Sequence, residues 1–577
     1  MPKTDIVVRM AGTAGEGALL MGDILGQALA KLGWDLLLYF SFEAEVRGEK
    51  PSFSQIRVSQ SPPHSQGEAV DILLGLNRNA LELNIPYLAT DGFAIYDGRP
   101  MDIFRGEELY EPPLPEGVRR SSVPLEVISQ RDLGFPAAKN IIALGALCKF
   151  LGVPPDIMKY LLEGRFSKKG ESVVSTNLKA FDIGHDHIFG FAPPFSLGKK
   201  GDPKLFVSGN RASAIGAMAG GCGFFAGYPI TPATEVMEYL AKDLPGLGGT
   251  VIQAEDEISA LGMVLGASFA GKRAMTATSG PGLSLMSEML GLSWVAEVPA
   301  IVLDVQRGGP STGLPTRPEQ SDLDLALHGG HGDVGRIVLA PTNVEECFHA
   351  VRSSFGLAEK YQMPVLVLTD QYIGYRRESL DSLKAEEAVQ DGRLKPSVQE
   401  LINYKRYQVT ENGISPLSVP GEEGGFFVAT GLEHTEEGLP NYDAEIHRAM
   451  SAKRFRKLDS ARAEKWFSRF GASDAEVGVL AWGSVVGAAM EAVEMACTEG
   501  IKVAGFYTVF MSPLPDEEMR GFIGSVRRII IPELNHTGQF ARLVRERFLV
   551  EPVSLALTLG GPITAGRILE AIRGGSI

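Results

Sequence analysis

The sequence predicts a multidomain α/β protein, and three observations support this class. The chain has 577 residues, 44% of them hydrophobic, which exceeds what a single core supports and suggests roughly three or four domains. Strand-like apolar runs alternate with helix-like amphipathic runs. Residues 184–203, rich in glycine, proline and charge, separate two well-patterned regions and are the best linker candidate. His185 and His187 fall there with no other ligand nearby, so we expect them to be loop histidines.

Charge and cysteine usage exclude several functional classes. The formal net charge of −15 opposes binding to nucleic acid or to an anionic membrane. No apolar stretch approaches the length of a membrane span and no signal-peptide pattern is present, so we expect a cytoplasmic protein. The cysteines are isolated from one another, which favours buried thiols over disulfides, metal ligands or iron-sulfur ligands. They are Cys148, Cys222, Cys347 and Cys497.

The first predicted domain covers residues 1–190. An apolar strand from Asp5 to Met10 runs into a glycine turn at residues 12–17, and a helical pattern follows. Such a turn can present backbone N–H groups to a phosphate. Its spacing is not that of a dinucleotide fingerprint, however, and close helix–strand packing explains the glycines better. Further strand-like runs occupy residues 54–59, 70–76 and 86–92.

The segment after the linker begins with the sequence YPITP at residues 228–232. Thr231 and Thr234 stand just before a predicted helix, and prolines restrict the backbone around Thr231. A threonine hydroxyl at a helix start can bind a substrate carboxylate together with nearby N–H donors. It can equally well cap the helix, and the local sequence leaves both interpretations open.

Glu257 opens an alanine- and glycine-rich helix, and the strand after this helix ends in the sequence TSGPG at residues 278–282. A carboxylic acid buried among small residues can exchange a proton with a heteroaromatic nitrogen. Taken alone, Glu257 would more often be a surface or capping carboxylate. Its combination with the glycine-containing turn favours a functional role.

This combination resembles the pyrimidine-binding domain of thiamine-diphosphate enzymes such as acetolactate synthase. In that family a glutamate hydrogen-bonds the aminopyrimidine ring of the cofactor. Glu257 matches it, rather than Glu255, because an alanine follows three residues later and a glycine nine residues later. Asp256 is then a neighbour. The resemblance also implies cofactor contacts from two further segments, Tyr228, Pro229 and Ile230 in one and Thr278, Ser279 and Gly280 in the other.

Residues 228–232, the Glu257 helix and residues 305–323 together resemble the 2-oxoacid:ferredoxin oxidoreductases. The resemblance implies that Thr231 and Arg307 bind the carboxylate of the oxoacid. A guanidinium fork suits a carboxylate, although Arg307 could instead form a structural ion pair.

The resemblance extends over nearly the whole chain and implies four segments. Residues 1–190 look like the family's gamma domain, fused here ahead of an alpha domain; the family's turn usually has more glycines than residues 12–17, so the resemblance assigns no coenzyme A site to it. Residues 204–380 correspond to the pyrimidine-binding domain. Residues 381–471 are a connecting segment, and residues 472–577 look like a transketolase carboxy-terminal domain.

The chain contains no Gly-Asp-Gly sequence, which thiamine enzymes use to hold Mg²⁺ on the cofactor's diphosphate. The resemblance implies that a beta subunit carries this Mg²⁺ site and a [4Fe-4S] cluster. It further implies a dimer of alpha–beta heterodimers that passes electrons to ferredoxin, with the active site at the subunit interface.

The implied reaction is a reversible oxidative decarboxylation of a 2-oxoacid to an acyl-coenzyme A, with 2-oxoglutarate as the favoured substrate. A second substrate carboxylate would need a cation, for which Arg317, Lys272 and Arg47 are candidates. Pyruvate or branched-chain specificity remains an alternative. So do two other classes of protein, a self-sufficient thiamine-dependent carboligase or decarboxylase and a non-catalytic regulatory relative.

Overall fold

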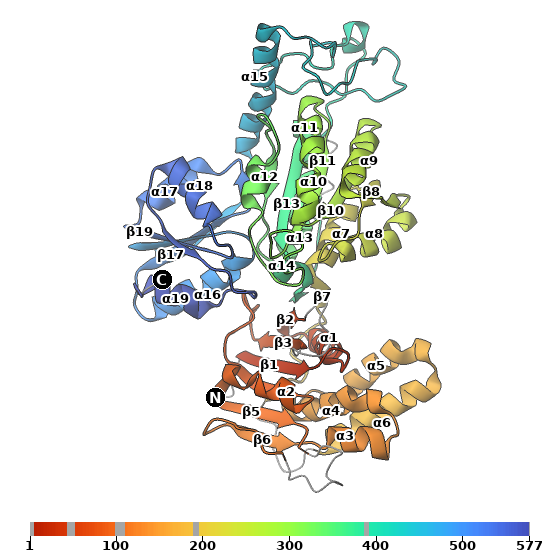
Figure 1. Ribbon diagram of the computed structural model, residues 1–577, viewed down its shortest axis with the longest axis vertical. Coiled ribbons are helices and arrows are strands. Elements are labelled where there is room, and N and C mark those ends of the chain that lie inside the picture. Colours follow the sequence, from red (N-terminus) through yellow and green to blue (C-terminus); the bar gives the residue numbers. More distant parts are fainter. Residues whose placement is uncertain (1–4, 43–51, 99–109, 188–194, 386–391, 576–577) are drawn as a thin grey trace. The chain divides into compact units, whose positions relative to one another are not determined.

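The computed structural model describes residues 5–42, 52–98, 110–187, 195–385 and 392–575. The chain divides into two compact units, each described here by itself (Figure 1). Unit 1 comprises Met1–Val207 with Arg376–Ser382, and unit 2 comprises Ser208–Tyr375 with Leu383–Ile577. Both contain the mixed α/β architecture that the sequence predicts. Within the described ranges, no helix combines the length and the apolar character needed to cross a bilayer.

Unit 1 is built on an eight-stranded sheet of mixed direction. Its strands, in spatial order, are β6 (Arg119–Ser122), β5 (Leu88–Tyr96), β4 (Val70–Gly75), β1 (Asp5–Gly12), β3 (Ser52–Ser59), β2 (Asp35–Ser41), β14 (Arg377–Leu380) and β7 (Leu205–Ser208). The pairs β1–β4, β4–β5 and β5–β6 are parallel, whereas β1–β3, β3–β2 and β2–β14 are antiparallel. The apolar runs predicted as strands all lie in this sheet.

The predicted strand–turn–helix opening is confirmed, since β1 leads through the glycine turn into α1 (Ala18–Lys31). The turn folds around one of its own side chains. The Glu16 carboxylate accepts hydrogen bonds from the Thr13 N–H at 2.8 Å and the Thr13 hydroxyl at 2.7 Å. Lys139 approaches the other Glu16 oxygen at 3.4 Å. An anion is thus already built into this turn, which favours the structural interpretation of its glycines over phosphate binding.

The prediction of loop histidines is wrong. Helix α6 (Glu171–His187) includes both His185 and His187. This helix packs against α4 (Lys139–Leu151) so closely that a Cβ on Gly184 would lie 1.9 Å from the carbonyl oxygen of Ile142. The buried contact extends the helix into the stretch predicted as linker, because packing of an apolar face stabilises a helix more than local propensity does.

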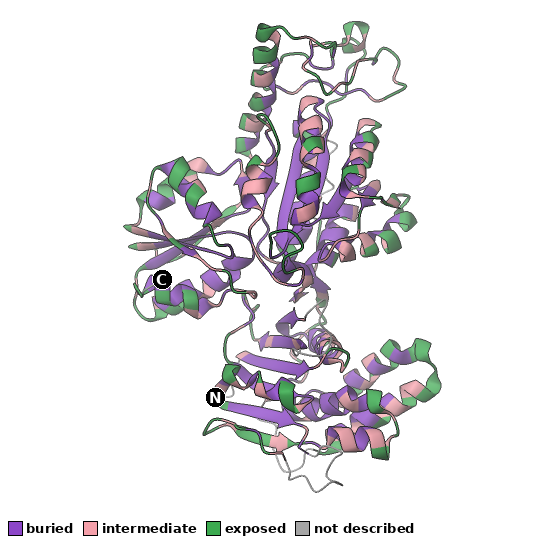
Figure 2. Cartoon of the chain, in the orientation of Figure 1, coloured by how far each residue is buried: buried purple, intermediate pink, exposed green. Residues whose placement is uncertain are grey.

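Unit 2 contains a seven-stranded sheet that is parallel except at one edge. Its strands, in spatial order, are β18 (Phe510–Ser512), β12 (Ile337–Leu339), β13 (Pro364–Asp370), β11 (Ala300–Gln306), β10 (Ala274–Thr278), β8 (Phe224–Gly227) and β9 (Thr250–Gln253). The helices that connect and cover them are α7 (Gly209–Ala219), α8 (Thr234–Asp243), α9 (Glu257–Phe269), α10 (Gly280–Leu285), α11 (Ser287–Val295), α12 (Leu323–His328), α13 (Val344–Tyr361) and α14 (Gln371–Tyr375). Every residue of β11 and β13 is buried (Figure 2), as expected for parallel strands covered on both faces.

The carboxy-terminal part of unit 2 forms a five-stranded sheet, again with one antiparallel edge strand. The strands, in spatial order, are β15 (Phe467–Gly471), β17 (Val503–Thr508), β16 (Val477–Ala481), β19 (Arg528–Glu533) and β20 (Val553–Ala556), and the helices are α16 (Val486–Thr498), α17 (Asp516–Gly524), α18 (Gln539–Phe548) and α19 (Ala565–Ile572). The predicted strand, helix and second strand appear as β16, α16 and β17. Because β18 pairs with β12, this part is joined to the seven-stranded sheet through backbone hydrogen bonds.

The segment predicted as connecting structure contains a 17-residue helix, α15 (Ala444–Ser460). Although the sequence of this helix is polar, the helix makes a buried contact. Lys453 and Lys457, both fully buried, donate to the Glu297 carboxylate, which follows α11 and is itself fully buried. Arg406 donates to the Glu297 carbonyl oxygen at 2.7 Å. This buried ionic cluster attaches the segment to the amino-terminal side of β11.

Three of the four cysteines are buried as predicted, and Cys497 is partly exposed. Burial raises the pKa of the Cys222 thiol to about 12 and raises the pKa of the Cys148 thiol further. Both thiols therefore remain protonated at neutral pH and act as small apolar side chains.

Candidate active site

The candidate site lies where the parallel strands of unit 2 end. β8, β9, β10 and β11 all present their carboxyl ends at one edge of the sheet, where ligands bind in open α/β sheets. The segments singled out in the sequence follow these strands directly. YPITP follows β8, Glu257 follows β9, TSGPG follows β10 and Arg307 follows β11.

Glu257 is the first residue of α9 and is only 6% exposed. Asp256 supplies the N-cap, because its carboxylate accepts the Ser259 N–H at 2.7 Å. This leaves Glu257 available for a role other than capping. Among the described residues, no side chain or backbone group donates a hydrogen bond to its carboxylate. A donor such as a ring N–H would therefore satisfy it.

The turn after β10 explains why the sequence there has two glycines. A Cβ on Gly282 would lie 2.0 Å from the Thr278 hydroxyl oxygen and 2.7 Å from Oε1 of Glu257. Only hydrogen fits at this position, so the turn lies against the Glu257 carboxylate. The Ser279 hydroxyl is buried without a hydrogen-bond partner among the described residues. Together these groups form a polar cradle suited to a heteroaromatic ring with donor and acceptor edges.

Arg307 and the YPITP turn meet across the sheet edge. Nη1 of Arg307 donates to the carbonyl oxygen of Thr231 at 2.6 Å. Helix α8 begins with Ala233 as its N-cap and has no side-chain cap, so the Thr231 hydroxyl is not used to cap the helix. Asn210 stabilises the turn, because its side-chain amide donates to the carbonyl oxygen of Pro232 at 3.1 Å. The predicted carboxylate-binding pair is therefore brought together by the fold.

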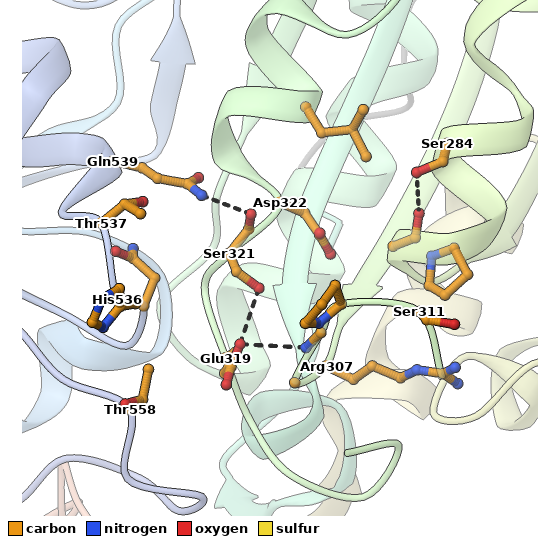
Figure 3. A pocket seen from close by; sticks show the side chains of 17 residues that line it. Ser284, Arg307, Ser311, Glu319, Ser321, Asp322, His536, Thr537, Gln539 and Thr558 are labelled. Atoms are coloured by element: carbon orange, nitrogen blue, oxygen red, sulfur yellow. Dashed lines mark hydrogen bonds between the residues drawn. The ribbon is translucent and has the colours of Figure 1, made fainter. Parts of the chain in front are cut away.

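A pocket of about 680 Å³ opens beside these groups (Figure 3). One wall includes Gly280, Pro281 and Arg307, and the opposite wall is formed by the turn between β19 and α18 with His536 and Thr537. The volume suits a small organic ligand. Arg307 is the only guanidinium that lines the pocket within the described ranges, and it is only 8% exposed.

The loop that carries Arg307 is held by the carboxy-terminal domain. Gln320, near the end of this loop, donates its backbone N–H to the Leu534 carbonyl oxygen at 2.6 Å and its side-chain amide to the Trp482 carbonyl oxygen at 2.8 Å. The Gln320 amide oxygen accepts the Leu534 N–H in return. The carboxy-terminal domain thus fixes the backbone that positions the guanidinium.

The other residues predicted to contact the cofactor or a second substrate carboxylate differ in burial and position. Tyr228 is 42% exposed, whereas Pro229 and Ile230 are half-buried at the end of β8. Of the cations suggested for a second substrate carboxylate, Lys272 is exposed beyond the carboxyl end of α9, about 20 Å from the start of that helix. Arg317 does not line the pocket, and Arg47 lies outside the described residues.

Two carboxyl groups of the site were missed in the sequence. Asp304 lies within β11 and Asp322 immediately before α12, both close to the predicted motif residues. Asp304 stands in an apolar strand, where an isolated buried carboxyl group is uncommon. That departure from the strand's apolar pattern is the signal that could have identified it.

Comparison with known proteins identifies the families that the two main segments of the chain resemble. Residues 215–453 match the family model described as "Pyruvate flavodoxin/ferredoxin oxidoreductase, thiamine diP-bdg". Residues 7–187 match the one described as "Pyruvate ferredoxin/flavodoxin oxidoreductase". Together the two models account for most of the chain.

Full-length relatives are similar along nearly their whole sequences. The alpha subunit of 2-oxoacid:ferredoxin oxidoreductase 2 from Aeropyrum pernix is 30% identical over 99% of this chain and 97% of its own length. The 2-oxoglutarate oxidoreductase subunit KorA from Mycobacterium tuberculosis is 32% identical over 99% of this chain and 91% of its own. The 2-oxoglutarate:ferredoxin oxidoreductase from Magnetococcus marinus, solved with 2-oxoglutarate, coenzyme A and succinyl-CoA bound, is 39% identical with a TM-score of 0.93 and 99% coverage of both chains.

Proposed function

Because the chain belongs to the 2-oxoacid:ferredoxin oxidoreductases, as an alpha subunit with a fused gamma-type segment, we propose that it converts 2-oxoglutarate and coenzyme A to succinyl-CoA and CO₂. The electrons pass to ferredoxin, and the reaction is reversible. The observation that best supports this proposal is the meeting of three features at one sheet edge: the buried Glu257 carboxylate, the TSGPG turn and the Arg307–Thr231 contact.

Each of these residues has a distinct role in the proposal. Thiamine diphosphate supplies the nucleophilic carbon and the electron sink for decarboxylation. Glu257 would hydrogen-bond the aminopyrimidine ring and exchange a proton with it, and Ser279 and Gly280 would line the same cradle. The Arg307 guanidinium and the Thr231 hydroxyl bind the C1 carboxylate of the oxoacid.

The chain requires a partner in this proposal. We place the diphosphate-bound Mg²⁺ and a [4Fe-4S] cluster on a beta subunit, because the sequence has no Gly-Asp-Gly and its cysteines are separate from one another. The relatives' designation as alpha subunits supports such an assembly. A dimer of alpha–beta heterodimers in the cytoplasm, reducing ferredoxin, is the arrangement we propose.

The deciding experiment is coenzyme-A-dependent reduction of a viologen dye by the chain copurified with its beta subunit. We expect 2-oxoglutarate to be used with a kcat/KM at least tenfold above those of pyruvate and branched-chain oxoacids. Preference for another oxoacid would still support the proposed reaction type but would contradict the assignment of 2-oxoglutarate as the substrate. Inactivity with every oxoacid, in a complex containing its cofactor and clusters, would contradict the proposed reaction.

Replacing Arg307 by lysine tests the carboxylate site. Lysine keeps the positive charge but loses the planar fork that donates to Thr231 and to a carboxylate at the same time. We expect KM for every 2-oxoacid to rise by about 10–100-fold, with a smaller change in kcat. The matched control is Arg542→Lys, an exposed arginine that pairs with Asp324 and does not line the pocket. An unchanged KM in Arg307→Lys would contradict the assignment.

A further inference from the structure

The carboxyl groups of Asp304 and Asp322 have no role in the proposed reaction of Glu257, Thr231 and Arg307. Asp304 is fully buried and lies directly opposite Thr278 across the parallel β10–β11 ladder. Neither of its carboxylate oxygens has a hydrogen-bond partner among the described residues. A buried carboxylate with no donor is strongly unfavourable, so this side chain requires either a proton or a donor.

Asp322 is the neighbour that meets this requirement. It precedes α12 and is partly exposed through the pocket, yet its Oδ2 is buried without a partner in the described part of the chain. The Asp322 N–H donates at 3.1 Å to the side-chain oxygen of Gln306, which lies two residues after Asp304 on the same face of β11. This contact places the two carboxyl groups side by side, where they interact. As two carboxylates they would only repel, whereas one proton between them would supply the missing donor.

Asp322 also contacts the turn beneath the proposed cofactor ring. A Cβ on Gly280 would lie 2.7 Å from Oδ2 and 2.8 Å from Oδ1 of Asp322. The carboxyl group therefore packs directly on the Gly280 backbone. Asp322 thus lies against the Ser279–Gly280 turn, which adjoins Glu257 through Gly282.

The surrounding charges favour a single shared proton. Burial and the charge of Asp322 raise the pKa of Asp304 well above its usual range. Burial and the charge of Glu319 raise the pKa of Asp322 to about 6, against the opposing effect of Arg307. In the described part of the chain, Glu319 and Arg307 are the charged groups that act on Asp322 besides Asp304. The strands flanking Asp304 place the uncharged Thr278 and Leu368 opposite it.

We propose that Asp304 and Asp322 share one proton and act as a positioning pair for the active site. The shared hydrogen bond holds Asp322 against the Ser279–Gly280 turn and leaves a single negative charge beside Arg307. The guanidinium then remains directed at the substrate carboxylate. This inference rests on the proposed function for the identity of the substrate, but the shared proton itself is a property of the chain alone.

Sharing of one proton by Asp304 and Asp322 makes substrate binding depend on pH. When the pair loses its shared proton, a second negative charge appears beside Arg307 and opposes binding of an anionic oxoacid. KM for 2-oxoglutarate should therefore rise with pH above the apparent pKa of the pair. The same loss weakens the fold, because a carboxyl group whose folded pKa is raised contributes stability at low pH that disappears as pH rises through that pKa.

Asp322→Asn is the decisive variant. Its amide donates to the Asp304 carboxylate and keeps the net charge of the protonated pair, but it cannot titrate. In the complex with the beta subunit we expect a KM for 2-oxoglutarate that no longer rises with pH. Asp304→Leu removes the partner, and we expect kcat/KM to fall by about tenfold or more. Asp324→Asn, two residues later in α12, should behave as wild type.

Infrared difference spectra of the isolated full-length chain test the shared proton without turnover. We expect a protonated-carboxyl C=O band near neutral pH that is absent in Asp322→Asn and present in Asp324→Asn. Persistence of the band and of the KM step in Asp322→Asn would overturn the proposal, as would wild-type kinetics in Asp304→Leu. If Asp304→Leu does not fold, Asp304→Asn is used in its place. We expect Asp304→Asn to lack the protonated-carboxyl band, and persistence of the band in this variant would overturn the proposal. If the chain shows the expected band but its complex turns over no oxoacid, the proposed function is refuted. The shared proton between Asp304 and Asp322 is then still supported.

Discussion

Replacing Glu257 by glutamine is expected to abolish oxoacid turnover while the chain remains folded and still binds its partner. Glutamine has the same size and fits over Gly282, but its amide cannot exchange a proton with the cofactor ring. Proton transfer by a positioned side chain contributes about 10²–10⁴-fold to a rate, so we expect kcat to fall by about 10³-fold. The measurement is viologen reduction by the complex with 2-oxoglutarate and coenzyme A.

Glu255→Gln provides the matched control. Glu255 is two residues earlier, exposed and outside the helix, so the same chemical change there should leave kcat at the wild-type level. Circular dichroism and copurification with the beta subunit would establish that both variants fold and assemble. Wild-type turnover by Glu257→Gln would remove the central residue from the proposed mechanism.

The largest loss of stability is expected from Glu297→Gln in unit 2. This change leaves Lys453 and Lys457 buried without their counter-ion. Removing one partner of a buried ion pair costs about 3–5 kcal/mol, because the remaining charge has been taken from water without compensation. Urea unfolding of the isolated chain should show a much lower midpoint for Glu297→Gln. Glu499→Gln, which breaks an exposed pair with Arg573, should leave the midpoint unchanged.

The ionic cluster also predicts how stability varies with pH. The lysines and Arg406 outweigh the effect of burial and hold the pKa of Glu297 well below its usual range. Its contribution is therefore present above about pH 4.5, the ordinary pKa of a glutamate, and is lost as pH falls below that value. Glu297→Gln should remove this acid-dependent loss. Because the cluster lies at the amino-terminal side of β11, opposite Arg307, kcat of the folded variant should be unchanged at low temperature. A kcat that falls together with stability would indicate that the cluster also supports the site.

Much of the fold and part of the site were accessible from the sequence. The apolar strand at the amino terminus, the Glu257 helix and the strand, helix and strand of the carboxy-terminal domain were all predicted in place. These features depend on periodicity and on turn residues, which are local properties of the chain. The TSGPG motif was identified from its resemblance to thiamine enzymes. The roles of Glu257, Thr231 and Arg307 remain predictions that the kinetic experiments test.

Features that depend on distant segments were not accessible in this way. The helix that includes His185 forms because Gly184 lets it pack closely on α4, and the local composition indicated a linker instead. The burial of Lys453 in a polar helix results from a glutamate 156 residues away. Gln320 holds the Arg307 loop through hydrogen bonds to a domain more than 150 residues later in the chain.

The sequence by itself determined the α/β class, the family and the residues at the ends of the parallel strands, because motifs and periodicity are encoded in neighbouring residues. Only the tertiary structure decided that Arg307 meets Thr231, that Gly282 lies against Glu257 and that Asp304 faces Asp322. These contacts join residues from different strands. Their geometry follows from strand order and register, which bring separate carboxyl ends together at one edge of the sheet.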